Sequence, residues 1–259
     1  LGWNHNALLK AKEHLGNAAL HKIANSDMYS VDYVEFVEKF AEITPDFSHY
    51  FFIDGGALAV ENALKAAFDW KAQKSGIRSL STVNELDVVH FYKAFHGRTG
   101  YTLSLTDSPD PRKTLYFPKF DWPRITNPKI TFPLDKNLDQ VVALEEKAIT
   151  EIKDAISKNP DNIASIIIEP IQGEGGDNHF RCEFMQELRS IADENDIMLI
   201  YDEVQTGIGV TGKMWAHQHL ASHACSDCCC GADSSAKPDI ISFGKKTQVC
   251  GIAVGKRVE

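Results

Sequence analysis

Two charged side chains, Lys245 and Asp202, stand 43 residues apart in the sequence, and each follows a mostly apolar run. Residues 240–243 read Ile-Ile-Ser-Phe, and residues 197–201 read Ile-Met-Leu-Ile-Tyr. Apolar runs that end in polar groups and a glycine are typical of buried strands, which deliver a charged residue to the rim of a sheet. A lysine amine can form an imine with an aldehyde cofactor, and an aspartate can keep a pyridine nitrogen protonated so that the ring accepts electrons. The pair therefore favours a pyridoxal phosphate site.

Further candidate residues follow other apolar segments, and each has a structural alternative. The sequence Gly-Gly-Ala at 55–57 opens a predicted helix, either as a tight turn or as a phosphate cradle, since free N–H groups and the helix dipole attract anions. Phe95 is either a core residue or a plate for an aromatic ring, and Arg98 is either a surface charge or a fork for a carboxylate. The glycine-rich segment 173–176 is either a flexible loop or part of the same rim. Their co-occurrence after strands of one chain favours the functional interpretations.

The elements that must position these residues alternate between helical and strand-like periods. Predicted helices cover residues 8–23, 31–43, 56–76, 138–158 and 182–194, and predicted strands cover 88–92, 163–168, 197–201 and 240–243. Residues 107–135 carry six prolines and little periodicity, so we expect an irregular excursion there. This order predicts an α/β fold with a mostly parallel sheet and helices on both faces. Ligands of such sheets bind beyond the carboxyl ends of the strands, where the candidate residues fall.

Composition argues against several classes of function. With 259 residues, 43% of them hydrophobic, the chain can bury a substantial core in one large domain or two modest ones. A formal charge of −9 argues against a nucleic-acid or anionic membrane partner. The sequence has no apolar stretch long enough to span a bilayer and no signal-peptide pattern, so we expect a cytoplasmic protein.

The cysteines are unevenly placed, since four of the six lie at 225 and 228–230. A Cys-x-x-Cys pair with His217, His219 and His223 nearby is one possible metal site, but a tetrahedral site normally draws on a second, distant ligand pair. Three consecutive cysteines cannot easily converge on one ion. We therefore expect no metal, and interpret the segment as a reduced surface insertion or a sequence artefact. A disulfide framework is not expected in a chain this long.

Five blocks of the sequence together resemble the class III aminotransferases, which are fold-type I enzymes that depend on pyridoxal phosphate. The blocks cover residues 55–65, 95–98, 169–177, 202–207 and 243–246. Two further stretches, 25–30 and 245–251, resemble the lysine 6-aminotransferase branch of that class. The resemblance extends over nearly the whole chain except for residues 221–236.

The resemblance implies a role for each residue of the cofactor site. Lys245 would bind pyridoxal 5′-phosphate covalently and shuttle the proton; Lys246 is the competing assignment, but the spacing from Pro238 favours Lys245. Asp202 would pair with the pyridine nitrogen, and Gln205 would sit by the phenolic oxygen and the substrate.

The remaining cofactor contacts come from earlier in the chain. The backbone N–H groups of Gly56 and Ala57 would bind the phosphate. Phe95 would stack on the ring, with His96 as a neighbour.

Two charged residues would handle the substrates. Arg98 would bind the remote carboxylate of either substrate, and Glu174 would mask a second arginine during the first half-reaction. The implied reaction transfers the side-chain amine of L-lysine to 2-oxoglutarate, giving 2-aminoadipate 6-semialdehyde and glutamate, a step of lysine catabolism. The alternatives are another ω-aminotransferase, acting on ornithine or 4-aminobutyrate, and a non-catalytic remnant that binds the cofactor.

The resemblance also implies a domain organisation. Residues 1–45 would form an N-terminal helical lead-in, and residues 46–259 the large cofactor-binding domain, ending before a C-terminal small domain. The start of the N-terminal segment, the second arginine and a threonine that reaches the phosphate from the other subunit of a homodimer would lie outside these 259 residues. We therefore expect the 259 residues alone to be poorly active or inactive.

Overall fold

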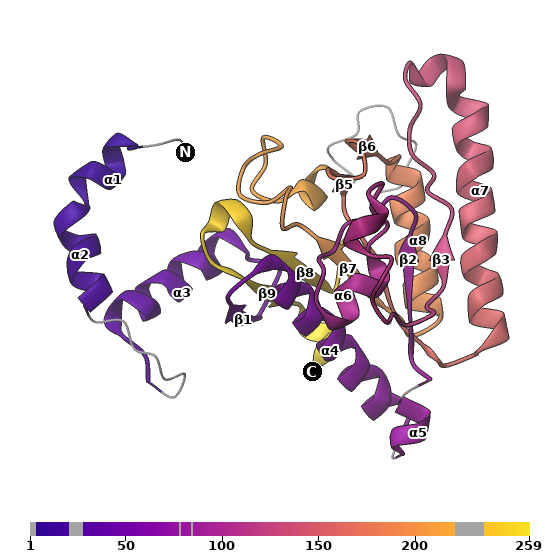
Figure 1. Cartoon of the computed structure of the whole chain (residues 1–259), viewed down its shortest axis with the longest axis horizontal. Helices are drawn as coiled ribbons and strands as arrows, with labels where there is room; N and C mark the ends of the chain where they lie inside the picture. Colours follow the sequence, from indigo (N-terminus) through magenta and orange to yellow (C-terminus); the bar gives the residue numbers. More distant parts are fainter. Residues whose placement is uncertain (1–3, 21–27, 78, 84, 221–235) are drawn as a thin grey trace. The chain divides into compact units, whose positions relative to one another are not determined.

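The computed structural model of the chain, drawn in Figure 1, describes residues 4–20, 28–77, 79–83, 85–220 and 236–259. The chain divides into two units, Leu1–Asp46 and Phe47–Glu259. Residues 25–27 and the cysteines at 225–230 lie outside the described residues, so the interpretations placed on them stay predictions.

The described residues of the first unit form helices α1 (Asn6–Lys10), α2 (Lys12–Leu20) and α3 (Val31–Ile43). The helix predicted for 8–23 is therefore two short helices that meet at Ala11. Helix α3 has the predicted bounds. Its start is capped because the side-chain oxygen of Ser30 accepts a hydrogen bond from the Tyr33 N–H at 3.2 Å.

A seven-stranded sheet forms the centre of the second unit, in the order β1-β9-β8-β7-β4-β2-β3. The strands are β1 (His49–Ile53), β2 (Asp87–Phe91), β3 (Arg124–Ile125), β4 (Ile163–Ile168), β7 (Met198–Asp202), β8 (Ile240–Phe243) and β9 (Cys250–Val254). Neighbours from β3 to β8 pair in parallel, and β9 and β1 are antiparallel to their neighbours. A separate pair, β5 (Ile171–Gln172) and β6 (Asn178–His179), lies in the loop after β4.

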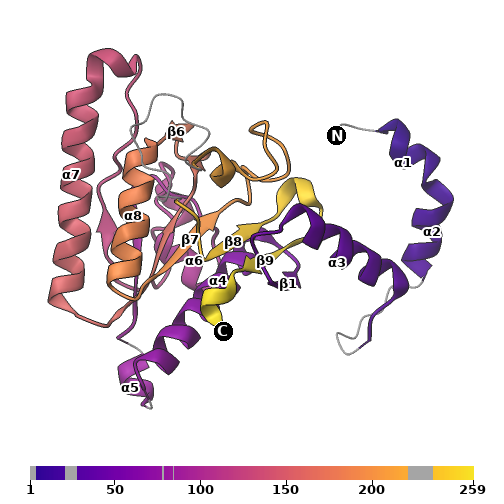
Figure 2. The same ribbon diagram turned by 180° about the vertical axis from the view of Figure 1, so that it is seen from behind.

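Long helices cover both faces of the sheet (Figures 1 and 2). Helix α4 (Gly56–Lys74) packs on one face because Val60, Ala63, Leu64 and Ala67 form a buried stripe at helical spacing. Strand residues of the same core cluster include Ile167, Ile200 and Ile240.

The opposite face carries α8 (Cys182–Glu194), with α7 (Leu134–Lys158) beside it. Strand side chains alternate between the two faces, so Phe91, three residues after Val88 of the α4 core, points to the α8 side. There its ring lies 6.0 Å from the ring of Phe184 in α8, centroid to centroid. The fold therefore has the two-faced α/β arrangement expected from the sequence.

Shorter elements fill the connections. They are α5 (Leu80–Val83), α6 (Gly100–Leu105) and the 3₁₀ turns η1 (Pro111–Lys113), η2 (Ala216–Leu220), η3 (Lys245–Thr247) and η4 (Lys256–Val258). The excursion at 107–135 is mostly irregular, as predicted, but it contains β3, which adds a parallel edge strand to β2. Helix α7 begins at Leu134, four residues before the predicted start.

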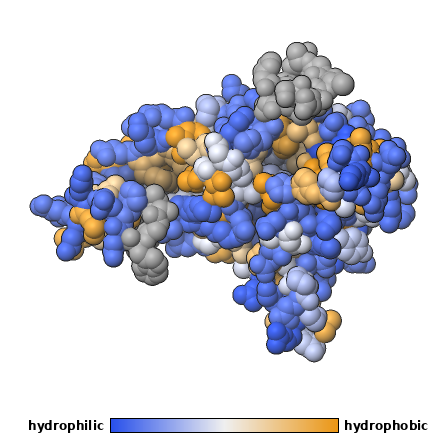
Figure 3. Space-filling model, turned by 90° about the horizontal axis from the view of Figure 1, so that it is seen from above, coloured by the Kyte–Doolittle hydropathy of each residue, from blue (hydrophilic) through white to orange (hydrophobic). Residues whose placement is uncertain are grey.

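The surface fits the acidic, polar composition. On the face shown in Figure 3, hydrophilic side chains cover most of the surface and hydrophobic ones form separate groups. Within the described part of the chain, every helix is too short or too polar to cross a bilayer.

Candidate functional site

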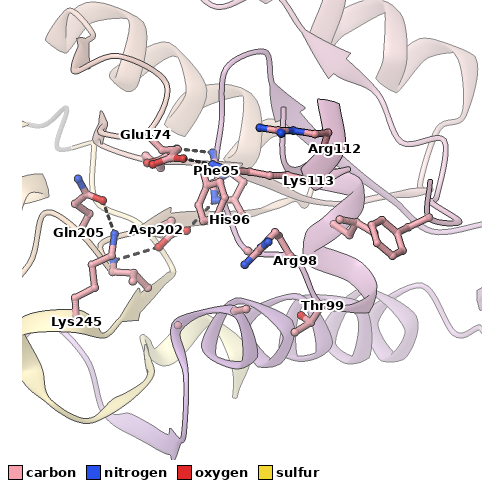
Figure 4. A pocket seen from close by; sticks show the side chains of 17 residues that line it. Phe95, His96, Arg98, Thr99, Arg112, Lys113, Glu174, Asp202, Gln205 and Lys245 are labelled. Carbon is pink, nitrogen blue, oxygen red and sulfur yellow. Dashed lines mark hydrogen bonds and ion pairs between the residues drawn. The ribbon is translucent and has the colours of Figure 1, made fainter. Parts of the chain in front are cut away.

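A pocket of about 640 Å³ opens where the parallel strands end (Figure 4). Asp202 is the last residue of β7, Lys245 follows β8, and Phe95 lies in the loop after β2. All nine site residues predicted from the sequence line this pocket: Gly56, Ala57, Phe95, His96, Arg98, Glu174, Asp202, Gln205 and Lys245. A volume of this size suits a small-molecule ligand.

Asp202 is a buried carboxylate whose oxygens are held by polar neighbours. Its Oδ1 accepts hydrogen bonds from the Ser242 hydroxyl at 2.9 Å and from the Val204 N–H at 3.1 Å. Its Oδ2 lies 2.8 Å from Nδ1 of His96. Hydrogen-bond donors around a carboxylate fix its position. A fixed anion at the end of β7 is suited to hold a cationic ring nitrogen.

His96 is buried beside this carboxylate. Burial alone would lower the pKa of His96, but the hydrogen bond with Asp202 and the charges of Asp202 and Glu169 raise it above its ordinary value. The other ring nitrogen, Nε2, is buried and has no hydrogen-bond partner among the described residues. An orphaned polar atom of this kind next to a pocket calls for a bound group or a water.

Lys245 presents its amine to the pocket from a strained turn. Its backbone has a φ of 50°, in the left-handed region that side chains other than glycine rarely adopt. Such conformations occur where the surrounding structure enforces them, often at functional sites. The Lys245 amine donates a hydrogen bond to the side-chain oxygen of Gln205. Of the two adjacent lysines, Lys245 lines this pocket and Lys246 does not.

The start of α4 provides a place for an anion. Gly55 occupies the N-cap position and, having no side chain, leaves the helix start uncapped, while Gly56 and Ala57 line the pocket. The first N–H groups of a helix lack partners within the helix, and together with the helix dipole they attract phosphate. The geometry supports the phosphate-cradle interpretation of these glycines.

Arg98 and Glu174 lie at the exposed side of the pocket. Arg98 makes no ion pair with another residue in the described part of the chain. Glu174 pairs with Lys113, with 2.7 Å between Nζ and Oε1. This hydrogen bond and the positive charge of Lys113 lower the pKa of Glu174. Lys113 comes from η1, within the proline-rich excursion, and no pattern around it in the sequence indicates a role in the site.

Glu169 is a second residue that the sequence analysis did not assign. It follows β4, lines the pocket and is 5% exposed. Its Oε1 accepts a hydrogen bond from the Phe95 N–H at 2.9 Å, and its Oε2 accepts one from the Gly173 N–H at 3.4 Å. Burial raises the pKa of Glu169 to about 7. In the sequence, only its position between an apolar run and a proline could have indicated that Glu169 lies at the end of a strand.

The residues around the pocket fit pyridoxal 5′-phosphate. They supply an amine, a fixed buried carboxylate, a partly buried aromatic ring and an uncapped helix start, which match the aldehyde, ring nitrogen, ring face and phosphate of that cofactor. By contrast, no group of His, Cys, Asp and Glu side chains suited to a metal ion occurs among the residues that the structure describes. The cysteine run at 225–230 is outside that set, so the expectation for it is untested.

Comparison with known proteins gives one consistent result. The family described as "Aminotransferase class-III" matches residues 1–255. The L-lysine-epsilon aminotransferase of Mycobacterium tuberculosis (strain H37Rv) is 48% identical over 264 aligned positions, which cover 100% of this chain and 55% of the relative. The L-lysine-epsilon aminotransferase of Amycolatopsis lactamdurans is 47% identical, over 94% of this chain and 51% of the relative. The chain thus spans about half the length of these curated relatives.

A solved structure agrees in fold. The structure titled "Lysine aminotransferase from M. tuberculosis in the internal aldimine form" superimposes with a TM-score of 0.86 at 49% identity, covering 100% of this chain and 57% of that one. The fold class predicted from the sequence is therefore confirmed.

Proposed function

The chain belongs to the class-III aminotransferase family, and on that premise we propose that the whole protein transfers the side-chain amine of L-lysine to 2-oxoglutarate. The products would be 2-aminoadipate 6-semialdehyde and glutamate. The observation that carries the proposal is that Asp202 ends strand β7, Lys245 follows the paired parallel strand β8, and both side chains line one pocket. Lysine as the amino donor is supported by the two L-lysine-epsilon aminotransferases that are 47% and 48% identical to this chain.

Pyridoxal 5′-phosphate, when bound, supplies an aldehyde that accepts an amino group and a ring that withdraws electrons from the neighbouring carbon. Lys245 is the amine that would hold it. Asp202 would pair with the ring nitrogen, Phe95 would lie on the ring face, and the N–H groups of Gly56 and Ala57 would bind the phosphate.

Lys245 is also the group placed to move a proton. Its Nζ lies at the pocket against the oxygen of Gln205, which orients the amine. An amine that is free at this position can take a proton from a substrate carbon and return it, as a general base and then a general acid. Gln205 would hold the amine in the position where that exchange takes place.

The cations of the pocket suit substrates that carry carboxylates. Arg98, Arg112 and Lys113 all line the pocket, and both proposed substrates carry carboxylates away from the reacting group. Arg98 is the cation best placed to bind them, because Lys113 is engaged by Glu174. Masking of a second arginine by Glu174 stays a prediction, because the described partner of Glu174 is Lys113.

The expected oligomeric state, cellular compartment and domain organisation rest on the resemblance and the composition. We expect a homodimer in which two subunits share each site, and we expect it to act in the cytoplasm. Residues 46–259 would be the large cofactor-binding domain and residues 1–45 the helical lead-in to it.

A panel of amino donors tests the proposed function. The whole protein, loaded with pyridoxal 5′-phosphate, is incubated with 2-oxoglutarate and either lysine, ornithine or 4-aminobutyrate, and glutamate formation is measured. The largest kcat/KM with lysine supports the proposal, and a larger value with another donor assigns the alternative ω-aminotransferase. A protein that carries the cofactor on Lys245 but forms no glutamate with any donor is the non-catalytic remnant.

A further inference from the structure

Glu169 is a buried carboxyl group in the pocket that the roles above leave unused. It is 5% exposed and directly follows β4, the strand beside β7. Burying a carboxyl costs free energy unless hydrogen bonds or charges compensate. The hydrogen bonds and charged neighbours of Glu169 therefore indicate its role in the site.

The two oxygens of Glu169 hold two different loops of the site. Oε1 accepts from the N–H of Phe95, 74 residues away in the sequence, at 2.9 Å. Oε2 accepts from the N–H of Gly173, four residues away, at 3.4 Å, which is a weaker bond. The first loop presents Phe95 and His96, and the second presents Glu174. One carboxyl group thus connects the loop expected to cover the ring with the loop expected to meet the substrate.

The second loop is close-packed as well as hydrogen-bonded. A Cβ added to Gly173 would lie 2.2 Å from Nε2 of Gln205, the residue whose oxygen accepts from Lys245. A shift of this loop would therefore reach Gln205 directly. The bond from Gly173 to Glu169 helps to prevent such a shift.

Glu169 also affects the protonation of His96, the residue hydrogen-bonded to Asp202. The charges of Asp202 and Glu169 both raise the pKa of His96. In return, the positive charge of His96 lowers the pKa of Glu169, opposing burial, while Asp202 raises it. Among the residues that the structure describes, His96, Asp202 and the N–H donors of the two loops are the charged and polar groups that act on Glu169. Two acidic groups therefore act on the charge of His96, and of these two only Asp202 forms a hydrogen bond with it.

We propose that Glu169 is a positioning residue: its carboxyl group fixes the Phe95 and Gly173 loops to one another and, when ionised, adds a second negative charge beside His96, so that Asp202 is presented correctly to the ring nitrogen of the cofactor. The inference rests on the proposed function, because the ring nitrogen belongs to the proposed cofactor.

Another buried carboxyl group, Glu145, provides a matched control. It is 8% exposed, and burial raises its pKa to about 7, as for Glu169. It belongs to α7, lies 3.5 Å from Arg181 and does not line the pocket. Loss of a buried carboxylate in general would affect both residues, whereas the positioning role belongs to Glu169 alone.

The first measurement needs no cofactor. The imidazole of His96 is titrated by NMR in the cofactor-free protein, with its signal assigned by its absence in His96→Gln. Glu169→Gln should lower the pKa of His96, because a negative neighbour is lost, and Glu145→Gln should leave it unchanged. Glu169→Asp keeps the charge with a shorter reach, so it should restore most of the His96 pKa. An unchanged His96 pKa in Glu169→Gln, or an equal fall in Glu145→Gln, overturns the proposal.

The second measurement separates positioning from binding. In the loaded protein, Glu169→Gln should lower kcat by about tenfold or more and change the KM for the amino donor by less than about threefold, because the effect is on presentation of the ring and not on substrate contacts. The pH dependence of the bound cofactor's absorbance should also shift in Glu169→Gln and stay as in the wild type in Glu145→Gln. An unchanged kcat together with an unchanged absorbance profile contradicts the inference. Failure of the wild-type protein to bind cofactor would instead refute the proposed function, while the His96 titration would still test the charge relation.

Discussion

Substitution of Gly97 by alanine should disturb the start of α4, because the loop after Phe95 packs directly on that helix start. Gly97 has a φ of +122°, and a Cβ built on it would lie 2.5 Å from Cβ and 3.0 Å from the backbone Cα of Ala57. Backbone cannot move aside as a long side chain can. The added methyl group must therefore displace the loop or the first turn of α4, where the phosphate is proposed to bind.

The expected loss of stability has two parts. Holding a residue other than glycine at such a positive φ costs about 1–3 kcal/mol. Forcing an extra methyl group into a close-packed contact costs about 1–3 kcal/mol more. Gly176 isolates the first part, because it has a φ of +114° but the nearest atom to its added Cβ is 3.9 Å away. Gly97→Ala should therefore be less stable than Gly176→Ala by about 1–3 kcal/mol.

Denaturant unfolding measures this difference. The free energy of unfolding is determined for the wild type and both variants in guanidinium chloride, with the same dependence on denaturant required of all three. Weaker binding of pyridoxal 5′-phosphate should accompany the larger loss in Gly97→Ala, because the contact lies at Ala57. Equal stability of Gly97→Ala and Gly176→Ala would refute the inferred contact between this loop and α4.

Three further predictions concern the buried residues Glu145 and Glu203 and the pocket residue Lys113. Glu145→Gln should raise the free energy of unfolding by about 1–2 kcal/mol at pH 8 and hardly change it at pH 4. The pKa of Glu145 in the folded protein, about 7, exceeds its ordinary value of 4.5, so the free energy of unfolding of the wild type falls as the pH rises from 4.5 to 7. An equal effect of Glu145→Gln on the free energy of unfolding at pH 4 and pH 8 would contradict this. Lys113→Met should raise the KM for 2-oxoglutarate by about two- to tenfold, because it removes a pocket cation and frees the charge of Glu174, and an unchanged KM in steady-state assays would exclude that role. Glu203→Ala should cost about 3–5 kcal/mol in thermal unfolding, because the fully buried carboxylate accepts hydrogen bonds from two backbone N–H groups and a threonine hydroxyl, and a loss below about 1 kcal/mol would argue against it.

Local sequence was sufficient to find the residues at the ends of strands. Asp202 and Lys245 each follow a buried apolar run, and parallel strands bring such ends to one edge of the sheet. The structure places Gly56 and Phe95 around the pocket, and their roles toward the cofactor stay predictions.

Residues positioned by long-range contacts were not predictable in the same way. Lys113 reaches Glu174 from an irregular, proline-rich excursion whose path has no periodic signal. The role of Glu169 depends on a backbone N–H that lies 74 residues away. Strand β3 has two residues, too few to show the alternating pattern of a strand. It forms because it pairs with β2, which lies far from it in the sequence.

The most direct test of the account asks which lysine binds the cofactor. The protein is incubated with pyridoxal 5′-phosphate, reduced with borohydride, digested, and analysed by mass spectrometry with fragmentation that separates Lys245 from Lys246. The Lys245→Ala and Lys246→Ala variants are treated in parallel. We predict a pyridoxyl group on Lys245 in the wild type and in Lys246→Ala, and none in Lys245→Ala. A pyridoxyl group on Lys246, or none on either lysine of the wild type, would contradict it.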